Sequence, residues 1–219
     1  MDEMHRLTEA LIHRWQPESV LVYGSFADGT EDALSDFDAL VITREPAPPR
    51  DQRPLMGRRQ DVWFLRPETV DVIEPVDWPQ LYHAIPLWDP EGMGERLIAD
   101  VREAVDAQPL PSPSQLTDEL AWMDRMLARA ASGSEEGRYR LLWLITDSLE
   151  IWCGLARRQS FGAKKSLALL RSADPEGHDL YSRALMNPAT ETAAAWVAHL
   201  RGMADRDAEA VPAQRSEST

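Results

Sequence analysis

Cysteine is nearly absent from this 219-residue chain, which contains only Cys153. A disulfide within the chain and a cysteine-based metal site are therefore excluded. Long apolar runs are missing too, because no stretch approaches the roughly 18 apolar residues that a membrane-spanning helix requires. The N-terminal residues MDEMHRLTEALIHRW form a charged amphipathic pattern that lacks the apolar core of a signal peptide. We therefore expect a cytoplasmic protein with no membrane partner.

Positive charge is also scarce. The chain has 23 lysine and arginine residues against 37 aspartate and glutamate residues, which gives a formal net charge of −14 at pH 7. Proteins that bind nucleic acid normally present a basic face, because phosphate neutralisation supplies most of the affinity. The composition thus predicts no nucleic-acid partner, and its field would attract a polycationic small molecule.

What the chain does have is an informative stretch from Gly24 to Asp38, GSFADGTEDALSDFD, directly after an apolar run. The apolar run predicts a buried strand that leads into a Gly-Ser turn, whose backbone N–H groups can face a phosphate. A second strand then carries Asp36 and Asp38 on one face, because alternate strand residues point the same way. Two carboxylates about 4 Å apart repel by roughly 4 kcal/mol at an effective dielectric of about 20, which favours a cation between them. Magnesium fits, since it prefers one or two carboxylates together with phosphate oxygens.

A third acid supports this interpretation. Residues 60–65 again read as a strand, and Asp61 is the only carboxylate in it. If this strand lies beside the strand of Asp36 and Asp38, the three carboxylates form a cluster suited to two-metal chemistry on a nucleoside triphosphate. The alternative for an isolated Asp-x-Asp pair is a solvated strand face.

The pattern of Gly-Ser, a ten-residue gap, Asp-x-Asp and a later strand Asp resembles the nucleotidyltransferase superfamily that includes DNA polymerase beta. Within it, the sequence is most similar to small bacterial enzymes that adenylylate aminoglycoside or lincosamide antibiotics. One departure is Asp28, which stands where many relatives carry arginine. An acid at that position is compatible with a bound triphosphate only if it faces solvent.

The resemblance implies a role for each matching residue. Gly24 and Ser25 would hold the triphosphate, Asp36 and Asp38 would ligate magnesium, and Asp61 would be a third ligand or the general base. The implied cofactor is Mg²⁺, and the implied co-substrate is ATP or another nucleoside triphosphate.

The predicted fold class is α+β, with a mixed sheet and flanking helices followed by a C-terminal helical bundle. We expect a nucleotidyltransferase catalytic domain over residues 1–107, a helical substrate-binding domain over 115–205 and a disordered tail over 206–219. The proline-rich segment 108–114 separates the two domains, because its three prolines cannot continue a helix.

Periodicity and breakers predict the individual elements. In the first domain, we expect helices over 2–15, 67–78 and 93–106 and strands over 19–23, 36–43, 60–65 and 84–88. In the second domain, we expect helices over 116–131 with a cap around Thr117, 138–158, 164–172, 179–186 and 190–204.

Two features of the helical domain are candidates for chemistry. Lys164 and Lys165 are the only lysines of the chain and stand at a predicted helix start. A compact ammonium and free backbone N–H groups both suit triphosphate oxygens, and a solvated helix start is the alternative. Asp147 and Glu150 interrupt an apolar stretch, so as buried acids they either meet arginines or line a cleft. The resemblance implies that one of these two carboxylates is the general base near the acceptor hydroxyl.

We therefore expect a magnesium-dependent nucleotidyltransferase that transfers AMP from ATP to a hydroxyl of a small molecule and releases pyrophosphate. The expected acceptor is an aminoglycoside-type antibiotic, which would give a role in antibiotic resistance. The alternatives are a protein adenylyltransferase of the toxin-antitoxin type and a non-catalytic nucleotide-binding module. A homodimer, as in many relatives, stays open.

Overall fold

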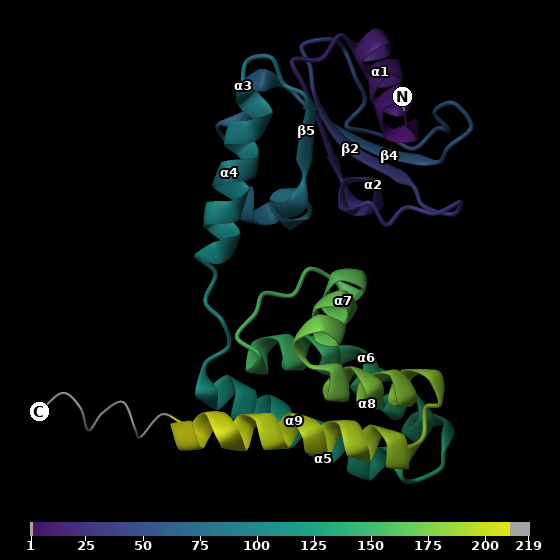
Figure 1. Cartoon of the computed structure of the whole chain (residues 1–219), viewed down its shortest axis with the longest axis vertical. Helices are drawn as coiled ribbons and strands as arrows, with labels where there is room; N and C mark the ends of the chain where they lie inside the picture. The colour runs from purple at the N-terminus through teal and green to yellow at the C-terminus, as the bar shows by residue number, and fades with distance from the viewer. Residues whose placement is uncertain (1, 211–219) are drawn as a thin grey trace, which may run out of the picture. The chain divides into compact units, whose positions relative to one another are not determined.

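The computed structural model describes residues 2–210, with side chains through residue 206. The chain divides into two compact units, Met1–Gln108 and Pro109–Thr219. The first unit is a mixed sheet with helices, and the elements of the second unit within residues 109–210 are all helices (Figure 1). The predicted α+β fold class is confirmed.

The sheet of the first unit has five strands in the order β3-β4-β2-β1-β5. Strand β1 is antiparallel to β2 and β5, β2 is parallel to β4, and β3 is antiparallel to β4. The strands are β1 (Ser19–Tyr23), β2 (Phe37–Ile42), β3 (Arg50–Asp51), β4 (Gln60–Leu65) and β5 (Ile85–Trp88). Four of them were predicted. Strand β3 was missed because a strand of two residues is too short to show an alternation of apolar and polar residues.

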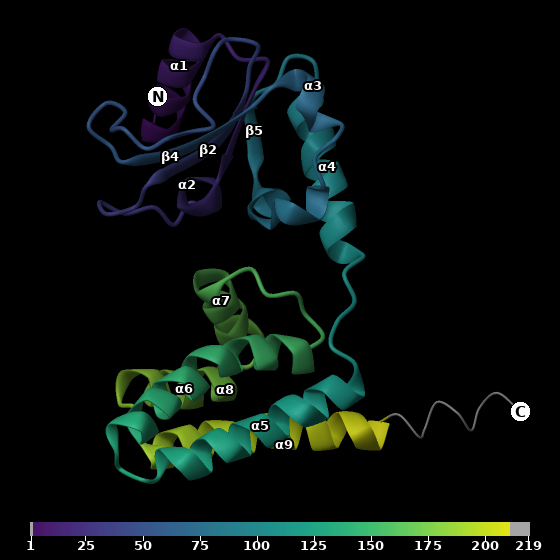
Figure 2. The same ribbon diagram turned by 180° about the vertical axis from the view of Figure 1, so that it is seen from behind.

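Alternation along the strands gives the sheet two distinct faces. Val20 and Val22 of β1 pack in one cluster with Leu7 and Leu11 of helix α1 (Glu3–Trp15). Leu21 points to the other face, toward Gly94 of helix α4 (Met93–Asp106). Figures 1 and 2 show α1 and α4 on different sides of the strands. Phe37, Ala39 and Val41 of β2 belong to the α1 cluster, which leaves Asp38 on the opposite face.

The connection between β4 and β5 departs from the predicted helix over 67–78. It forms a one-turn helix α3 (Pro67–Val70) and two 3₁₀ helices, η1 (Pro75–Asp77) and η2 (Pro79–His83). Pro75 has no N–H to donate to a continuing α-helix, so it breaks the predicted element, and Pro79 starts a second 3₁₀ helix just beyond its end.

The second unit contains five described helices around one core. They are α5 (Pro113–Ala130), α6 (Glu135–Leu155), α7 (Ala163–Ala173), α8 (Pro175–Met186) and α9 (Thr190–Ala210). Trp152 of α6 and Trp196 of α9 are its largest fully buried side chains. The five predicted helices are all present.

Helix boundaries in the second unit correct two predictions. Helix α5 begins at Pro113 rather than near Thr117, because Ser112 and Gln115 form a capping box and proline is compatible with the first helical position. Helix α9 extends to Ala210, so residues 206–210 are helical and not part of a tail. Alanine, arginine and glutamate in this stretch are strong helix formers. Residues 211–219 of the predicted tail lie outside the described residues. Within 2–210, no helix combines the length and the apolar character needed to cross a membrane.

Candidate functional site

Three strands bring a tyrosine and two aspartates to the same level of the sheet. Tyr23 of β1 pairs with Asp38 of β2, and Asp38 pairs in register with Asp61 of β4. Directly paired residues share a face, so the side chains of Tyr23, Asp38 and Asp61 all project away from α1. The backbone register therefore sets Asp38 and Asp61 side by side, as the sequence predicted.

Gly24 follows Tyr23 directly and lies against the Asp38 carboxylate. A Cβ at position 24 would be 2.4 Å from Oδ2 of Asp38, and the backbone has φ +68° there. Only glycine adopts this φ without strain and leaves room for the carboxylate. Gly24 thus has two independent reasons to be glycine in this structure.

Helix α2 (Gly24–Asp28) carries Ser25 in its first turn. The buried ring of Phe26 packs edge-on against Phe37 of β2, with ring centroids 5.3 Å apart, which anchors this short helix beside Asp38. First-turn N–H groups of a helix have no intrahelical acceptors. Asp28, at the other end of α2, is exposed to solvent, which meets the condition set by its departure from the family pattern.

Two of the three predicted metal ligands are paired with arginines. Arg50 donates from Nε to Oδ1 and from Nη2 to Oδ2 of Asp61, both at 2.5 Å. Arg59 donates from Nε to Oδ1 of Asp36 at 2.6 Å. Among the residues that the structure describes, the Asp38 carboxylate has neither a hydrogen-bond donor nor an ion-pair partner.

The electrostatics of Asp38 follow from this difference. Burial, together with the negative charges of Asp61 and Asp36, raises the pKa of Asp38 to about 6. Burial also raises the pKa of the Tyr23 phenol, with contributions from the Asp38 and Asp61 charges. Asp38 is therefore the place where negative charge is least compensated, and a bound cation would reverse the sign of this shift.

The described residues contain no group of three or more His, Cys, Asp or Glu side chains that could hold a metal ion. The predicted cluster of three converging carboxylates is thus not present in this arrangement, because Arg50 and Arg59 hold Asp61 and Asp36. The donor chemistry nevertheless fits magnesium, which needs only one or two carboxylates when phosphate oxygens complete its shell. Metal ligation by Asp36, Asp38 and Asp61 stays a prediction.

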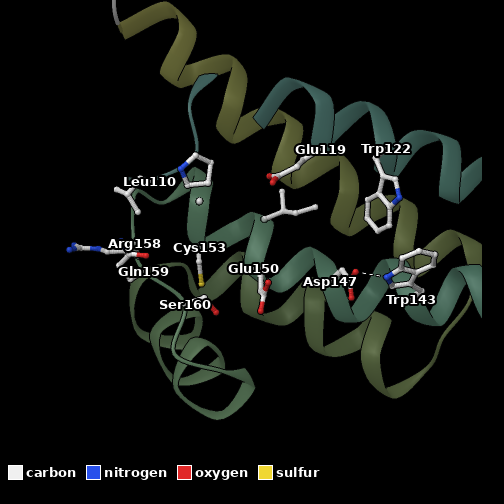
Figure 3. A pocket seen from close by; sticks show the side chains of 13 residues that line it. Leu110, Glu119, Trp122, Trp143, Asp147, Glu150, Cys153, Arg158, Gln159 and Ser160 are labelled. Carbon is white, nitrogen blue, oxygen red and sulfur yellow. Dashed lines mark hydrogen bonds between the residues drawn. The ribbon is translucent and has the colours of Figure 1, made fainter. Parts of the chain in front are cut away.

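Asp147 and Glu150 line a pocket of about 420 Å³ in the helical unit (Figure 3). Both side chains are exposed, so the prediction that they are buried is wrong. They occupy the solvent side of α6, where the indole Nε1 of Trp143 donates to Oδ2 of Asp147. In the described part of the chain neither acid has an arginine partner. Of the two predicted environments, a cavity lining is the one found.

Sequence reasoning missed other residues of this pocket, above all Glu119 and Trp122 of α5. Oε2 of Glu119 is buried without a hydrogen-bond partner among the described residues. Burial raises the pKa of Glu119, and the charge of Glu150 raises it further. Helical spacing was the available signal, since Glu119 and Trp122 are three apart and Trp143, Asp147 and Glu150 are four and three apart.

Lys164 and Lys165 lie in the first turn of α7, which follows Gly162 with φ +84°. Their predicted position at a helix start is confirmed. Their contact with a triphosphate stays a prediction.

Comparisons with known proteins bear on the first unit. Residues 4–85 match the family model of the nucleotidyltransferase domain. This segment holds Gly24, Ser25, Asp36, Asp38 and Asp61 and the strands β1 to β4, together with only the first residue of β5. The match supports the nucleotidyltransferase superfamily, and with it nucleotidyl transfer.

A structural comparison finds a nucleotidyltransferase-like protein from Exiguobacterium sibiricum, with 12% sequence identity and a TM-score of 0.41. The match covers 93% of this chain and 75% of that chain. Among curated proteins, none matches.

Proposed function

We propose that this protein is a magnesium-dependent nucleotidyltransferase that transfers AMP from ATP to a hydroxyl of a small, amine-bearing molecule. The observation that carries the proposal is Asp38, set in register with Asp61 and pressed against Gly24 within the matched domain. In the reaction, the acceptor oxygen forms a bond to the α-phosphorus of ATP. The bond from that phosphorus to the β-phosphate bridge breaks, and pyrophosphate leaves.

The chain's own residues supply binding and proton transfer in this proposal. The first-turn N–H groups at Gly24 and Ser25 bind triphosphate oxygens, helped by the helix dipole. Asp36 and Asp38 hold Mg²⁺, with Asp61 as a third ligand or as the base that accepts the hydroxyl proton. Bound magnesium would lower the pKa of the attacking hydroxyl and neutralise phosphoryl charge. Lys164 and Lys165 are further candidates for triphosphate contacts.

The pocket of the helical unit supports an amine-bearing acceptor such as an aminoglycoside. Three acids, Asp147, Glu150 and Glu119, outnumber the single cation of the lining, Arg158. Trp122 and Trp143 add two aromatic rings with centroids 5.8 Å apart. Ammonium groups are attracted both to carboxylates and to aromatic faces. In this proposal, Glu150 or Asp147 is the alternative base for the acceptor hydroxyl. The net charge of −14 disfavours a nucleic-acid acceptor.

The test offers radiolabelled ATP and Mg²⁺ to the protein with a panel of aminoglycosides and, separately, with cell lysate. We expect label on a small molecule and release of pyrophosphate. Asp38→Asn should reduce transfer by about a thousandfold or more, because a metal ligand contributes several kcal/mol to transition-state stabilisation. Asp100→Asn, at an exposed position of α4, is the matched control and should keep full activity.

Three results would contradict the proposal. Label on a lysate protein instead of a small molecule would favour the protein-adenylyltransferase alternative. ATP binding without pyrophosphate release would favour a non-catalytic module. Full activity of Asp38→Asn would remove the metal assignment.

A further inference from the structure

We propose that Arg50 and Arg59 are exchangeable counter-ions, which neutralise Asp61 and Asp36 in the metal-free protein and turn to the triphosphate when metal and nucleotide bind. This inference rests on the proposed function. It assigns a role to two residues that neither the sequence pattern nor the family match singled out.

The geometry of Arg50 supports the first half of this role. Arg50 lies on the edge strand β3, opposite Trp63 of β4, and its guanidinium carbon is 4.8 Å from the centroid of the Trp63 ring. Trp63 and Asp61 are two residues apart on β4, so both share the face of Asp38. From this position Arg50 donates to both oxygens of Asp61. A metal ion would have to compete with two charge-assisted hydrogen bonds for this ligand.

Arg59 makes the corresponding contact from the neighbouring segment. It directly precedes β4, and its carbonyl oxygen accepts a hydrogen bond from the backbone N–H of Phe37 at 2.9 Å. This backbone contact fixes position 59 next to the start of β2, where Asp36 stands. The Arg59 side chain reaches Oδ1 of Asp36 through Nε.

Exposure indicates that the Arg59–Asp36 contact opens at small cost and that the bidentate Arg50–Asp61 contact opens at a larger one. The side chains of Arg50 and Arg59 are 42% and 74% exposed, and those of Asp61 and Asp36 are 22% and 39% exposed. Ion pairs between exposed groups contribute little, since water and salt screen them. A guanidinium released from either aspartate is still tethered near the site. The planar guanidinium suits phosphate oxygens, so the same side chain can exchange the carboxylate for the triphosphate as its hydrogen-bond acceptor.

Charge balance gives the reason for an exchange. Fully ionised, the three aspartates carry three negative charges, and the two arginines compensate two of them, which leaves Asp38 without a partner. A divalent cation bound at Asp38 would repel both guanidinium groups, and Asp61 and Asp36 would then be available as its ligands. The incoming triphosphate then offers the arginines new acceptors. Loss of these arginines should therefore strengthen the binding of metal alone and weaken the binding of nucleotide when metal is present.

The experiment measures Mn²⁺ binding by titration calorimetry and by the EPR signal of free Mn²⁺, without nucleotide. In Arg50→Gln and Arg59→Gln we expect Mn²⁺ to bind about threefold to fivefold more tightly than in the native protein, the ratio expected when an exposed competing pair is removed. With a non-hydrolysable ATP analogue present, the analogue should bind several-fold more weakly in both variants. Arg50→Lys, which keeps the charge but loses the two-point contact, should fall between native and Gln values.

Arg44→Gln is the matched control, because Arg44 pairs with Glu18 at 2.5 Å on the same unit and its side chain is 68% exposed. It should change neither measurement. Thermal unfolding of each variant confirms that it is folded.

The results separate this inference from the proposed function. If Asp38→Asn binds Mn²⁺ as well as the native protein does, the metal site and the proposed function both fail. If Asp38→Asn loses Mn²⁺ but both arginine variants match the native protein, only the exchange is refuted. Weaker Mn²⁺ binding in the arginine variants would also refute it, because the arginines would then support the ligands rather than compete for them.

Discussion

Both units bring acidic side chains from different elements near one another, but they hold them in different ways. In the first unit, Asp38 and Asp61 are fixed by the hydrogen-bonded register of β2 and β4, and arginines neutralise Asp61 and Asp36. In the second unit, the acids project from two packed helices into a pocket, and Asp147 and Glu150 have no arginine partner among the described residues. A strand site compensated by arginines suits ions that must be exchanged. A pocket with three acids and one arginine, Arg158, in which Asp147 and Glu150 are not paired with an arginine, suits a ligand that brings its own positive charge.

The largest effect outside the metal ligands should come from Gly24→Ala, which tests the strand site of the first unit. Its Cβ would clash with the Asp38 carboxylate and its φ would be strained. We expect a loss of about 1–3 kcal/mol in the free energy of unfolding and a loss of transfer activity of about a hundredfold, because the carboxylate must move. Urea unfolding and labelled-ATP assays measure the two effects.

Gly29→Ala is the control for Gly24→Ala. Gly29 also has a positive φ, but a Cβ there would meet nothing within 4 Å. Backbone strain without a clash should lower stability and spare most of the activity. Equal activity losses in the two variants would show that the contact with Asp38 is unimportant.

An intermediate effect is expected in the helical pocket. Glu150→Gln and Glu119→Gln each remove one negative charge from the lining, so the acceptor KM should rise by about tenfold, within the range of one charged contact. The KM for ATP should stay unchanged. Asp179→Asn, an exposed position on α8 outside the pocket, should have no effect on either constant. A rise in the KM for ATP, with no change in the KM for the acceptor, would show that these acids contact the nucleotide instead.

The smallest effect concerns the pH dependence of stability in the metal-free protein. The pKa of Asp38 is raised from 3.8 to about 6, so between these values the folded protein binds this proton more tightly than the unfolded chain does. The free energy of unfolding should therefore fall as the pH rises through this window. Because Asp38 is partly exposed, solvent screening reduces the expected change to about 1 kcal/mol.

Urea unfolding at pH 4.5 and pH 7 measures this change as a difference between the native protein and Asp38→Asn. The variant should lose the component that falls with rising pH and should be the more stable of the two at pH 7. Asp51 works in the opposite direction, because its hydrogen bonds from Arg53 lower its pKa to about 2 and its contribution is lost only in stronger acid. Identical pH profiles for both proteins would show that Asp38 is not destabilised by its neighbours.

Much of the strand site was readable in the sequence. Alternation placed Asp38 and Asp61 on strands, and the apolar runs around them fixed the face that must be buried. The start of α7 at the lysine pair was readable for the same kind of local reason. The errors fell where local signals conflict, as at the prolines of η1 and η2, or where an amphipathic helix exposes a side that its composition makes look buried, as at Asp147 and Glu150.

The sequence by itself determined most of the elements, the fold class and the acidic residues of the strand site, because periods of two and 3.6 residues act within a few neighbours. Tertiary structure alone decided that Arg50 reaches Asp61 across β3 and β4, that Gly24 makes room for Asp38, and that Glu119 of α5 joins Glu150 of α6 in one pocket. Each of these contacts joins residues that are far apart in the chain. Which distant side chains meet depends on how strands pair and helices pack. The hydrophobic pattern of one segment does not show which other segment it will contact.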